Sequence, residues 1–396
     1  MATLVSEPAR LPRGLRFHPF LREFLPAYLE GTGTGLLPRQ RKVLHRILCC
    51  RTPALGGQLY ACPSCPRVHY RYHSCNDRHC PQCGDHDTQT WLARQQRLLV
   101  RANHFLFTFT VPEALRAWIY THPKLGYDLL FAASSQALQD VAALPKHLGG
   151  PLGMMGVLHT WSRTLIFHPH IHYFIPGGAL SSDGCSWIPA RHKFLLPVKV
   201  LSLRVRTLFR QHLEEQAPEL LKLVPRKVWR QPWIVHGKAT GAGDKTLAYL
   251  ANYIFKTASA NRPLNLLPTG QVQWPYKDNA TGQWLTLKLQ PQELIRRFVQ
   301  HVLPEGYCRV RCFGWLHPAA KARLNRIRAL LRQTPLLSPR EQAAWQLPEN
   351  LLPEDPPVPA LSPPVPVCPH CQKPMLLVAS WFAGSPVPRP EQARAP

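Results

Sequence analysis

The sequence predicts an α+β protein built on a ferredoxin-like antiparallel sheet with the element order βαββαβ. Phenylalanines alternate with other residues over 104–111, and this period of two predicts a strand. Three further strands and two intervening helical segments follow along the chain. The strands are expected over 153–160, 165–175 and 232–239, and the helices over 113–145 and 199–216. In a split βαβ arrangement the first and third strands lie in the middle of the sheet.

The flanking segments divide the chain into five expected parts. An N-terminal arm ends in a glycine-rich joint, a cysteine-dense part contains helices over 38–50 and 88–103, and the sheet region follows. A basic helical extension then leads into a tail in which 16 of 62 residues are proline, so the tail is expected to be extended, disordered and unpacked. The five parts are residues 1–35, 36–102, 103–283, 284–334 and 335–396.

The charge of the chain indicates a polyanionic partner. The 396 residues include 48 Lys and Arg against 22 Asp and Glu, a formal net charge of +26. Positive charges at this density repel one another, and this repulsion is usually compensated by a phosphate-rich ligand such as nucleic acid or by an anionic membrane surface. A hydrophobic content of 45% excludes wholesale disorder.

The only uncharged stretch of membrane length does not resemble a transmembrane helix. It runs over residues 164–182 and contains three His, two Pro and two Gly. The first 20 residues carry three arginines and no apolar core, so no secretory signal is expected. We therefore expect a cytoplasmic protein, whose twelve cysteines are metal ligands or buried thiols rather than disulfides.

Two C-x-x-C motifs predict a structural zinc site. Cys62 and Cys65 form the first, Cys80 and Cys83 form the second, and 14 residues separate the two motifs. This spacing is typical of four thiolates around one tetrahedral ion, whose binding would fold a segment poor in apolar residues. Buried thiols or a redox pair are the alternative. Cys75, His69 and His79 are further potential ligands, so one of them could replace one of the four cysteines.

The remaining cysteines allow a second, weaker hypothesis. Another metal site could be formed by the C-x3-C motif of Cys308 and Cys312 and the C-x-x-C motif of Cys368 and Cys371. The segment around Cys368 and Cys371 is the one part of the tail that could be ordered. The other cysteines are interpreted as core thiols. They are Cys49, Cys50 and Cys185.

Basic residues surround the first cysteine motifs. Arg67, Arg71 and Arg78, with Tyr70, suit a module that grips a phosphate backbone, and a solvated surface is the alternative.

Histidines alternate along the expected strand at 165–175. His170 and His172 point to the same face, about 6.6 Å apart at 3.3 Å per residue, and can share one metal ion. His168 lies about 13 Å from His172 by the same rise, so all three cannot bind one ion in a straight strand. His159 is a weak candidate for a third ligand, since a tight hairpin would bring it nearer His168. Core histidines without metal are the alternative.

The amphipathic helix expected over 244–258 presents two tyrosines. At 100° per residue its apolar residues share one face, and two lysines and two tyrosines share the opposite face. Core tyrosines would share the apolar stripe, so these phenols are candidates for chemistry; a solvated face with incidental tyrosines is the alternative. The apolar residues are Leu247, Leu250, Ala251 and Ile254, and the polar ones are Lys245, Tyr249, Tyr253 and Lys256.

The histidine strand and the tyrosine helix together indicate phosphodiester chemistry. A tyrosine oxygen can attack phosphorus while a histidine-held metal polarises the non-bridging oxygens, and the ester formed stores the bond energy for religation. No ATP is needed, and neither a true P-loop nor an H-E-x-x-H motif is present in the sequence.

Four motifs in this order resemble the rolling-circle transposases of the insertion-sequence 91 family, in the HUH endonuclease superfamily. The motifs are Cys62–Cys83, Val157–Trp161, His168–His172 with Pro176–Gly178, and Tyr249–Tyr253. The resemblance covers roughly residues 36–330. It implies cleavage and joining of single-stranded DNA by a two-tyrosine enzyme on a ferredoxin-like palm. Residues 36–102 would be the zinc-binding, DNA-binding domain and 103–283 the catalytic domain.

The resemblance also implies roles for individual residues. His170 and His172 would bind Mg²⁺ or Mn²⁺, and Tyr249 and Tyr253 would each form a 5′-phosphotyrosine link and leave a free 3′-hydroxyl. The partners would be single-stranded DNA at the element ends and target DNA in a bacterial nucleoid, with no membrane involved. A plasmid replication initiator or relaxase of the same chemistry, and a zinc protein that binds nucleic acid without catalysis, are the alternatives.

Overall fold

In the computed structural model, the chain forms two compact units. The first comprises residues 1–41 and 84–336, and the second comprises residues 42–83 and 337–396. The structure describes residues 16–32, 35–255, 264–278, 281–333, 365–389 and 391. The chain therefore does not divide into the five consecutive parts expected from composition, because the second unit joins two segments from distant parts of the sequence.

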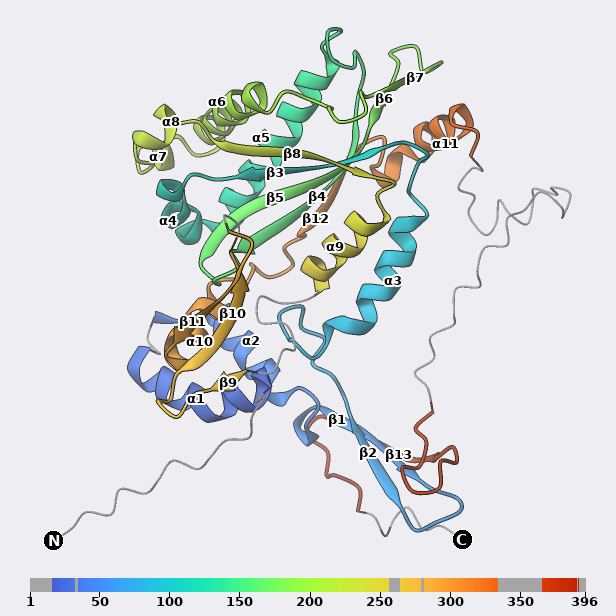
Figure 1. The fold of residues 1–396 in the computed structure, drawn as a ribbon. Helices are drawn as coiled ribbons and strands as arrows, with labels where there is room; N and C mark the ends of the chain where they lie inside the picture. The colour runs from blue at the N-terminus through green and yellow to red at the C-terminus, as the bar shows by residue number, and fades with distance from the viewer. Residues whose placement is uncertain are drawn as a thin grey trace, which may run out of the picture. The chain divides into compact units, whose positions relative to one another are not determined.

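The first unit is built on a five-stranded antiparallel sheet with the order β12-β4-β5-β3-β8 (Figure 1). Four of its strands begin and end within two residues of the predicted ones, and β3 and β5, the first and third of these along the chain, lie between the other two. The strands are β3 (His104–Thr110), β4 (Gly153–Trp161), β5 (Phe167–Pro176), β8 (Ile234–Gly241) and β12 (Val310–Gly314). The α+β class is confirmed.

One face of this sheet is covered by three helices, α4 (Glu113–Thr121), α5 (Pro123–Ala143) and α6 (Val198–Gln216) (Figure 1). Alternate side chains of β3 and β5 enter the core on this face. They are Phe105, Phe107, Phe109, Ile171, Tyr173 and Ile175, all at most 2% exposed. Because strand side chains alternate, the residues between them point to the opposite face.

The opposite face carries α9 (Asp244–Phe255), beside which lies α3 (Gly84–Gln96) (Figure 1). Phe174 of β5 and Val157 of β4 pack there against Leu247 and Leu250 of α9. His170 and His172 are on this side too, since they share the alternation of Phe174. The sheet thus assigns the histidines and the tyrosine helix to one face.

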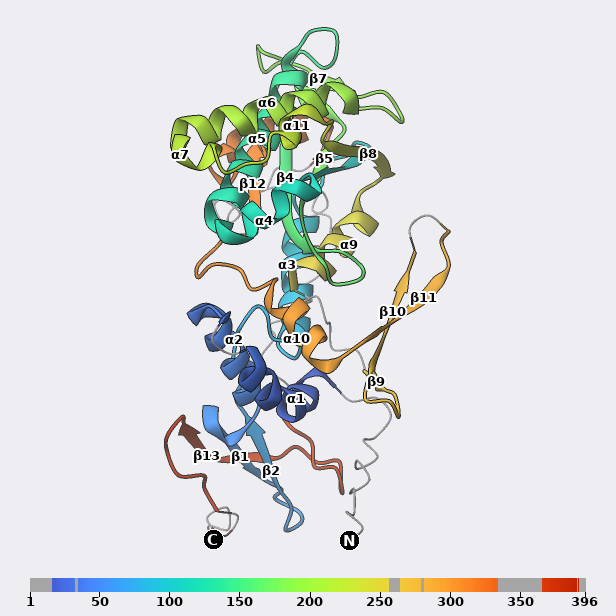
Figure 2. The same ribbon diagram turned by 90° about the vertical axis from the view of Figure 1, so that its left-hand side faces the viewer.

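The remaining elements of the first unit correct two predictions. Residues 17–32 form helix α1, not an arm, because Phe17 packs on Phe298 of α10 with ring centroids 4.6 Å apart. The segment 284–334 is only partly helical, since it supplies β11 and the edge strand β12. These elements are α1 (Phe17–Thr32), β6 (Gly178–Leu180), β7 (Trp187–Pro189), α7 (Pro218–Leu221), α8 (Lys227–Arg230), β9 (Asn265–Leu266), β10 (Val272–Lys277), β11 (Trp284–Leu289), α10 (Pro291–Val299) and α11 (Lys321–Leu330). Figure 2 shows β10 and β11 as a long antiparallel hairpin.

The second unit contains a three-stranded antiparallel sheet with the order β13-β1-β2. Helix α2 (Pro38–Cys49) runs into it, followed by β1 (Gly56–Ala61) and β2 (Val68–Tyr72), and β13 (Leu376–Phe382) comes from the tail. The prediction of an unpacked tail is therefore wrong for residues 365–389, since the proline-rich average concealed a proline-free strand. Residues 334–364 lie outside the described part of the chain.

Among the described residues, no helix is long and apolar enough to span a bilayer.

Candidate histidine–tyrosine site and cysteine clusters

Three buried histidines meet on the α9 face of the sheet. His159 of β4 is the register partner of His170 of β5, and their Nδ1 and Nε2 atoms lie 2.9 Å apart. The ring of His172 is centred 4.8 Å from that of His170 and 5.9 Å from that of His159. Each side chain is at most 8% exposed, and one ring nitrogen of each lies within 4.8 Å of the others. The three can therefore bind one ion.

The register corrects the expected position of His159. A tight hairpin would have paired it nearer His168, but residues 162–166 separate β4 from β5 and a register irregularity follows His159. His159 therefore faces His170 directly. The pair predicted from sequence, His170 and His172, lies together as expected.

Hydrogen bonds orient two of the imidazoles. Nδ1 of His170 lies 2.6 Å from the carbonyl oxygen of His168, to which it can only donate, so its Nε2 keeps a lone pair. Nδ1 of His172 lies 2.8 Å from Oγ1 of Thr108, its register neighbour on β3. Partners of this kind fix ring orientation in metal sites. Thr108 belongs to no sequence motif that would mark it as a functional residue. The alternation over 104–111 is the one feature of the sequence that could have pointed to it.

The spacing of the nitrogens fits a small divalent cation. Two ligands at right angles in an octahedral site, each about 2.1 Å from Mg²⁺, would lie about 3.0 Å apart. The 2.9 Å between His159 and His170 agrees with that edge.

Burial keeps these imidazoles neutral at neutral pH. It lowers the pKa of His172 to about 4 and places the pKa values of His159 and His170 well below their usual value. Neutral imidazole is the form that binds metals.

The same shift predicts an acid-sensitive fold in the absence of metal. Between pH 6.5 and about pH 4, His172 takes up a proton in the unfolded chain but not in the folded one. The free energy of unfolding should therefore decrease as the pH is lowered through this window. His172 should account for up to about 3 kcal/mol of the decrease. Urea titrations in chelator at pH 7 and pH 4.5 measure this. His172→Gln should show a smaller decrease, and an equal decrease in both proteins would contradict the assignment.

Helix α9 carries the first tyrosine to the histidines. Its apolar face is buried as predicted, with Leu250 0% and Ile254 8% exposed. The helix follows Gly243, whose positive φ of 95° and close approach to the ring of His104 leave no room for a side chain. At its other end, Nη1 of the buried Arg309 donates to the carbonyl of Ile254 at 2.9 Å, a contact the sequence did not reveal.

Tyr249 lies beside the histidine cluster. Its side chain is 42% exposed, and its ring is centred 6.2 Å from that of His172 in an edge-to-face arrangement. Tyr253 follows one turn later on α9, and Lys245 is exposed near the start of the helix. The side chain of Tyr253 and all of Lys256 lie outside the described part of the chain. The site thus combines an accessible phenol with three neutral imidazoles.

The cysteines form two clusters rather than the single predicted site. The grouping of Cys62, Cys65, Cys80 and Cys83 around one ion is wrong, because each C-x-x-C motif has different partners. In one cluster Cys80 and Cys83 join Cys50 and Cys75, and in the other Cys62 and Cys65 join Cys368 and Cys371. Ligand spacing along the chain does not reveal which motifs meet in space.

The other cysteine predictions are corrected at the same time. Cys50, expected to be a core thiol, is a cluster member, and Cys185 is exposed. Cys368 and Cys371 do not pair with Cys308 and Cys312.

The first cluster, Cys50, Cys75, Cys80 and Cys83, has the dimensions of a tetrahedral thiolate site. Sγ of Cys83 lies 3.5 Å from that of Cys50 and 3.7 Å from that of Cys75. Zn–S bonds of about 2.3 Å give a tetrahedral edge of about 3.8 Å. Of the three further potential ligands expected from the sequence, Cys75 belongs to this cluster. Nδ1 of His79 lies 2.9 Å from a carboxylate oxygen of Asp77 instead, and His69 is exposed.

The predicted phosphate-binding arginines lie near these cysteines in the sequence. Arg67 and Arg78 are exposed, and Arg71 is half-buried on β2.

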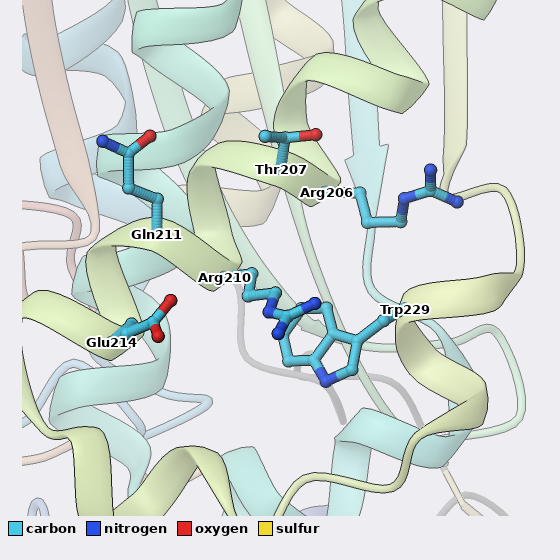
Figure 3. Close-up of a pocket in the computed structure, with 6 residues that line it drawn as sticks. All are labelled: Arg206, Thr207, Arg210, Gln211, Glu214 and Trp229. Atoms are coloured by element: carbon cyan, nitrogen blue, oxygen red, sulfur yellow. The ribbon is translucent and has the colours of Figure 1, made fainter.

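A hollow of about 300 Å³ lies on the helical side of the first unit (Figure 3). It is formed by α6 and Trp229 of α8, and no predicted site residue lines it. Its lining is Arg206, Thr207, Arg210, Gln211, Glu214 and Trp229. Because α6 covers the sheet face opposite α9, this hollow is not part of the histidine–tyrosine site.

Comparison with known families finds two matching segments in the chain. Residues 20–111 match the model of a transposase zinc-binding domain, and residues 153–323 match a model described as a putative transposase. A putative transposase, y4qJ, of Sinorhizobium fredii is 38% identical over 301 residues, 72% of this chain and 76% of the relative. The transposase for insertion sequence element IS801 of Pseudomonas savastanoi pv. phaseolicola is 30% identical over 328 residues, 79% of this chain and 78% of the relative. No solved structure matches.

These matches define the class of the protein as a DNA transposase with a zinc-binding domain. The cysteine clusters accordingly support structural zinc. The chain belongs to the insertion-sequence 91 family of transposases, and the resemblance inferred from its motifs is confirmed.

Proposed function

We propose that this transposase cleaves and rejoins single-stranded DNA through 5′-phosphotyrosine intermediates, as in rolling-circle transposition. The observation that carries the proposal is the position of Tyr249, accessible and 6.2 Å from His172 on the face where three histidines meet. The strand order, with β3 and β5 between β4 and β8, supports a ferredoxin-like palm of the HUH type.

The proposed step is a transfer of one phosphodiester bond. The phenolic oxygen of Tyr249 loses its proton and attacks phosphorus, the bond from phosphorus to the 3′ oxygen breaks, and that oxygen leaves with the electron pair and takes up a proton. The product is a 5′-phosphotyrosine ester and a free 3′-hydroxyl. Attack by a 3′-hydroxyl on the ester reverses the step and joins a strand without ATP.

The chain's own residues position this step. His159, His170 and His172 would hold a Mg²⁺ or Mn²⁺ ion, which supplies Lewis acidity to the non-bridging oxygens when bound. Thr108 orients His172. Tyr253, one turn from Tyr249, would be the second nucleophile, so that one strand is held while another is cut.

The net charge of +26 supports binding to DNA at the element ends and at the target, in the bacterial nucleoid. We assign phosphate contacts to exposed or half-buried basic residues of the cysteine-motif segment and of helix α9, and to one further lysine of the tyrosine segment. They are Arg67, Arg71, Arg78, Lys245 and Lys256.

The proposal is tested by a covalent-adduct assay. Purified protein and Mn²⁺ are incubated with labelled single strands from both flanks of its gene, and the products are separated under denaturing conditions. We expect a protein–DNA adduct that is absent in Tyr249→Phe/Tyr253→Phe. If the double variant still supports transposition in cells as well as the wild type, the covalent mechanism is wrong, and a DNA-binding role without tyrosine chemistry remains.

A further inference from the structure

The second cysteine cluster joins two distant parts of the sequence within the second unit. Sγ of Cys62 lies 3.4 Å from that of Cys371, and Sγ of Cys65 lies 3.5 Å from that of Cys368. All four sulfur atoms lie within 4.8 Å of one another, and none of these cysteines forms a disulfide. The family models match residues 20–111 and 153–323, so neither covers Cys368 and Cys371.

The two C-x-x-C motifs have the same local backbone structure. The amide of Cys62 donates to the carbonyl of Arg67 at 2.9 Å, and the amide of Cys368 donates to the carbonyl of Lys373 at 2.9 Å. Each motif therefore forms a turn closed five residues after its first cysteine. This matched pair of turns brings two thiols from each side toward one point.

The cluster has the spacing and burial of a tetrahedral thiolate site. Sulfur separations of 3.4 and 3.5 Å approach the tetrahedral edge of about 3.8 Å, and Cys62 and Cys368 are buried. Four thiolates at this spacing need a cation to offset their repulsion.

The N-terminal strand β1 is shaped to receive β13. Gly57 is the register partner of Trp381, and a Cβ atom at Gly57 would lie 2.8 Å from the indole. Gly56 has a positive φ of 78°, and a Cβ there would lie 2.4 Å from the carbonyl oxygen of Trp381. Trp381 is 4% exposed, although its neighbour Phe382 is 77% exposed. These glycines are explained by close packing of the C-terminal segment.

Among the described residues, apolar packing beside the cluster is sparse. The buried residues there are Tyr60, Cys62, Cys368 and Met375, and Leu376 of β13 is 62% exposed. So small a core contributes little stability by itself, and metal binding is the usual supplement in segments of this kind.

We propose that Cys62, Cys65, Cys368 and Cys371 bind a second zinc ion, which fixes the C-terminal strand β13 to β1. The chain then holds two zinc ions, one entirely within the segment that matches the zinc-binding family and one shared between that segment and the C-terminal part.

The zinc content of the purified full-length protein tests the proposal. We expect two zinc ions per chain in the wild type and one in Cys368→Ser/Cys371→Ser. The matched control Cys308→Ser/Cys312→Ser changes two cysteines outside either cluster and should retain two. One zinc ion per wild-type chain, or two in Cys368→Ser/Cys371→Ser, would overturn the proposal. The wild-type value is decisive even if a variant folds poorly.

Hydrogen exchange tests the structural role of the second ion. In Cys368→Ser/Cys371→Ser, the amides of β13 should exchange at least about tenfold faster than in the wild type, because their bonds to β1 open locally. The amides of β3, in the other unit, should exchange at wild-type rates. Unchanged protection of β13 in this variant would show that no ion is needed to hold the strand.

Discussion

Tyr249→Phe is expected to lower the rate of single-strand cleavage by on the order of 10³-fold or more, because it removes the attacking oxygen and keeps the ring. Tyr249 is 42% exposed, so the free energy of unfolding should change by no more than about 0.5 kcal/mol. Cleavage of a labelled strand in Mn²⁺ measures the first effect, and urea unfolding measures the second. Loss of cleavage with an unchanged fold would assign the nucleophile.

Two comparisons sharpen this prediction. Tyr120, 36% exposed on α4, offers a matched control, and Tyr120→Phe should cleave at the wild-type rate. Tyr253→Phe distinguishes the two candidate nucleophiles. If Tyr253→Phe loses the adduct while Tyr249→Phe keeps it, the cleaving tyrosine is Tyr253 and our assignment of Tyr249 is wrong.

The local features of the site could be predicted from the sequence because they depend on periodicity. Alternation over 104–111 and 165–175 placed β3 and β5 within two residues, and it also put His170 and His172 on one face. The buried face of α9 followed from its 3.6-residue period in the same way. Such patterns reflect burial on one side of an element, which neighbouring residues determine.

Features that depend on pairing between elements could not be predicted in this way. His159 reaches His170 only through the register of β4 against β5, which the length of the connecting segment sets. The partners of Cys62 and Cys80 likewise depend on which segments fold together, and both motifs have the same spacing. In such cases the sequence supplies the ligand types, and the fold decides how they are combined.

His172→Ala is expected to abolish Mn²⁺ binding and with it the covalent adduct, because His172 contributes one of three converging nitrogens. Thr108→Val removes only the hydroxyl 2.8 Å from Nδ1 of His172 and should weaken Mn²⁺ binding by about 10–100-fold. Calorimetric titration with Mn²⁺ measures both affinities. Complete loss of binding in His172→Ala and partial loss in Thr108→Val are expected if His172 is a metal ligand that Thr108 orients. A buried core histidine that binds no metal would show neither effect.

His168→Ala provides the control within the same strand. His168 lies outside the three-histidine cluster, and it is its backbone carbonyl, retained in alanine, that holds Nδ1 of His170. Mn²⁺ affinity should therefore stay at the wild-type value. If His168→Ala loses Mn²⁺ as completely as His172→Ala, the ion is not held by the cluster of His159, His170 and His172 alone, and the ligand set assigned here is wrong. If neither variant changes Mn²⁺ affinity, the histidines form a metal-free core and the catalytic ion must bind elsewhere.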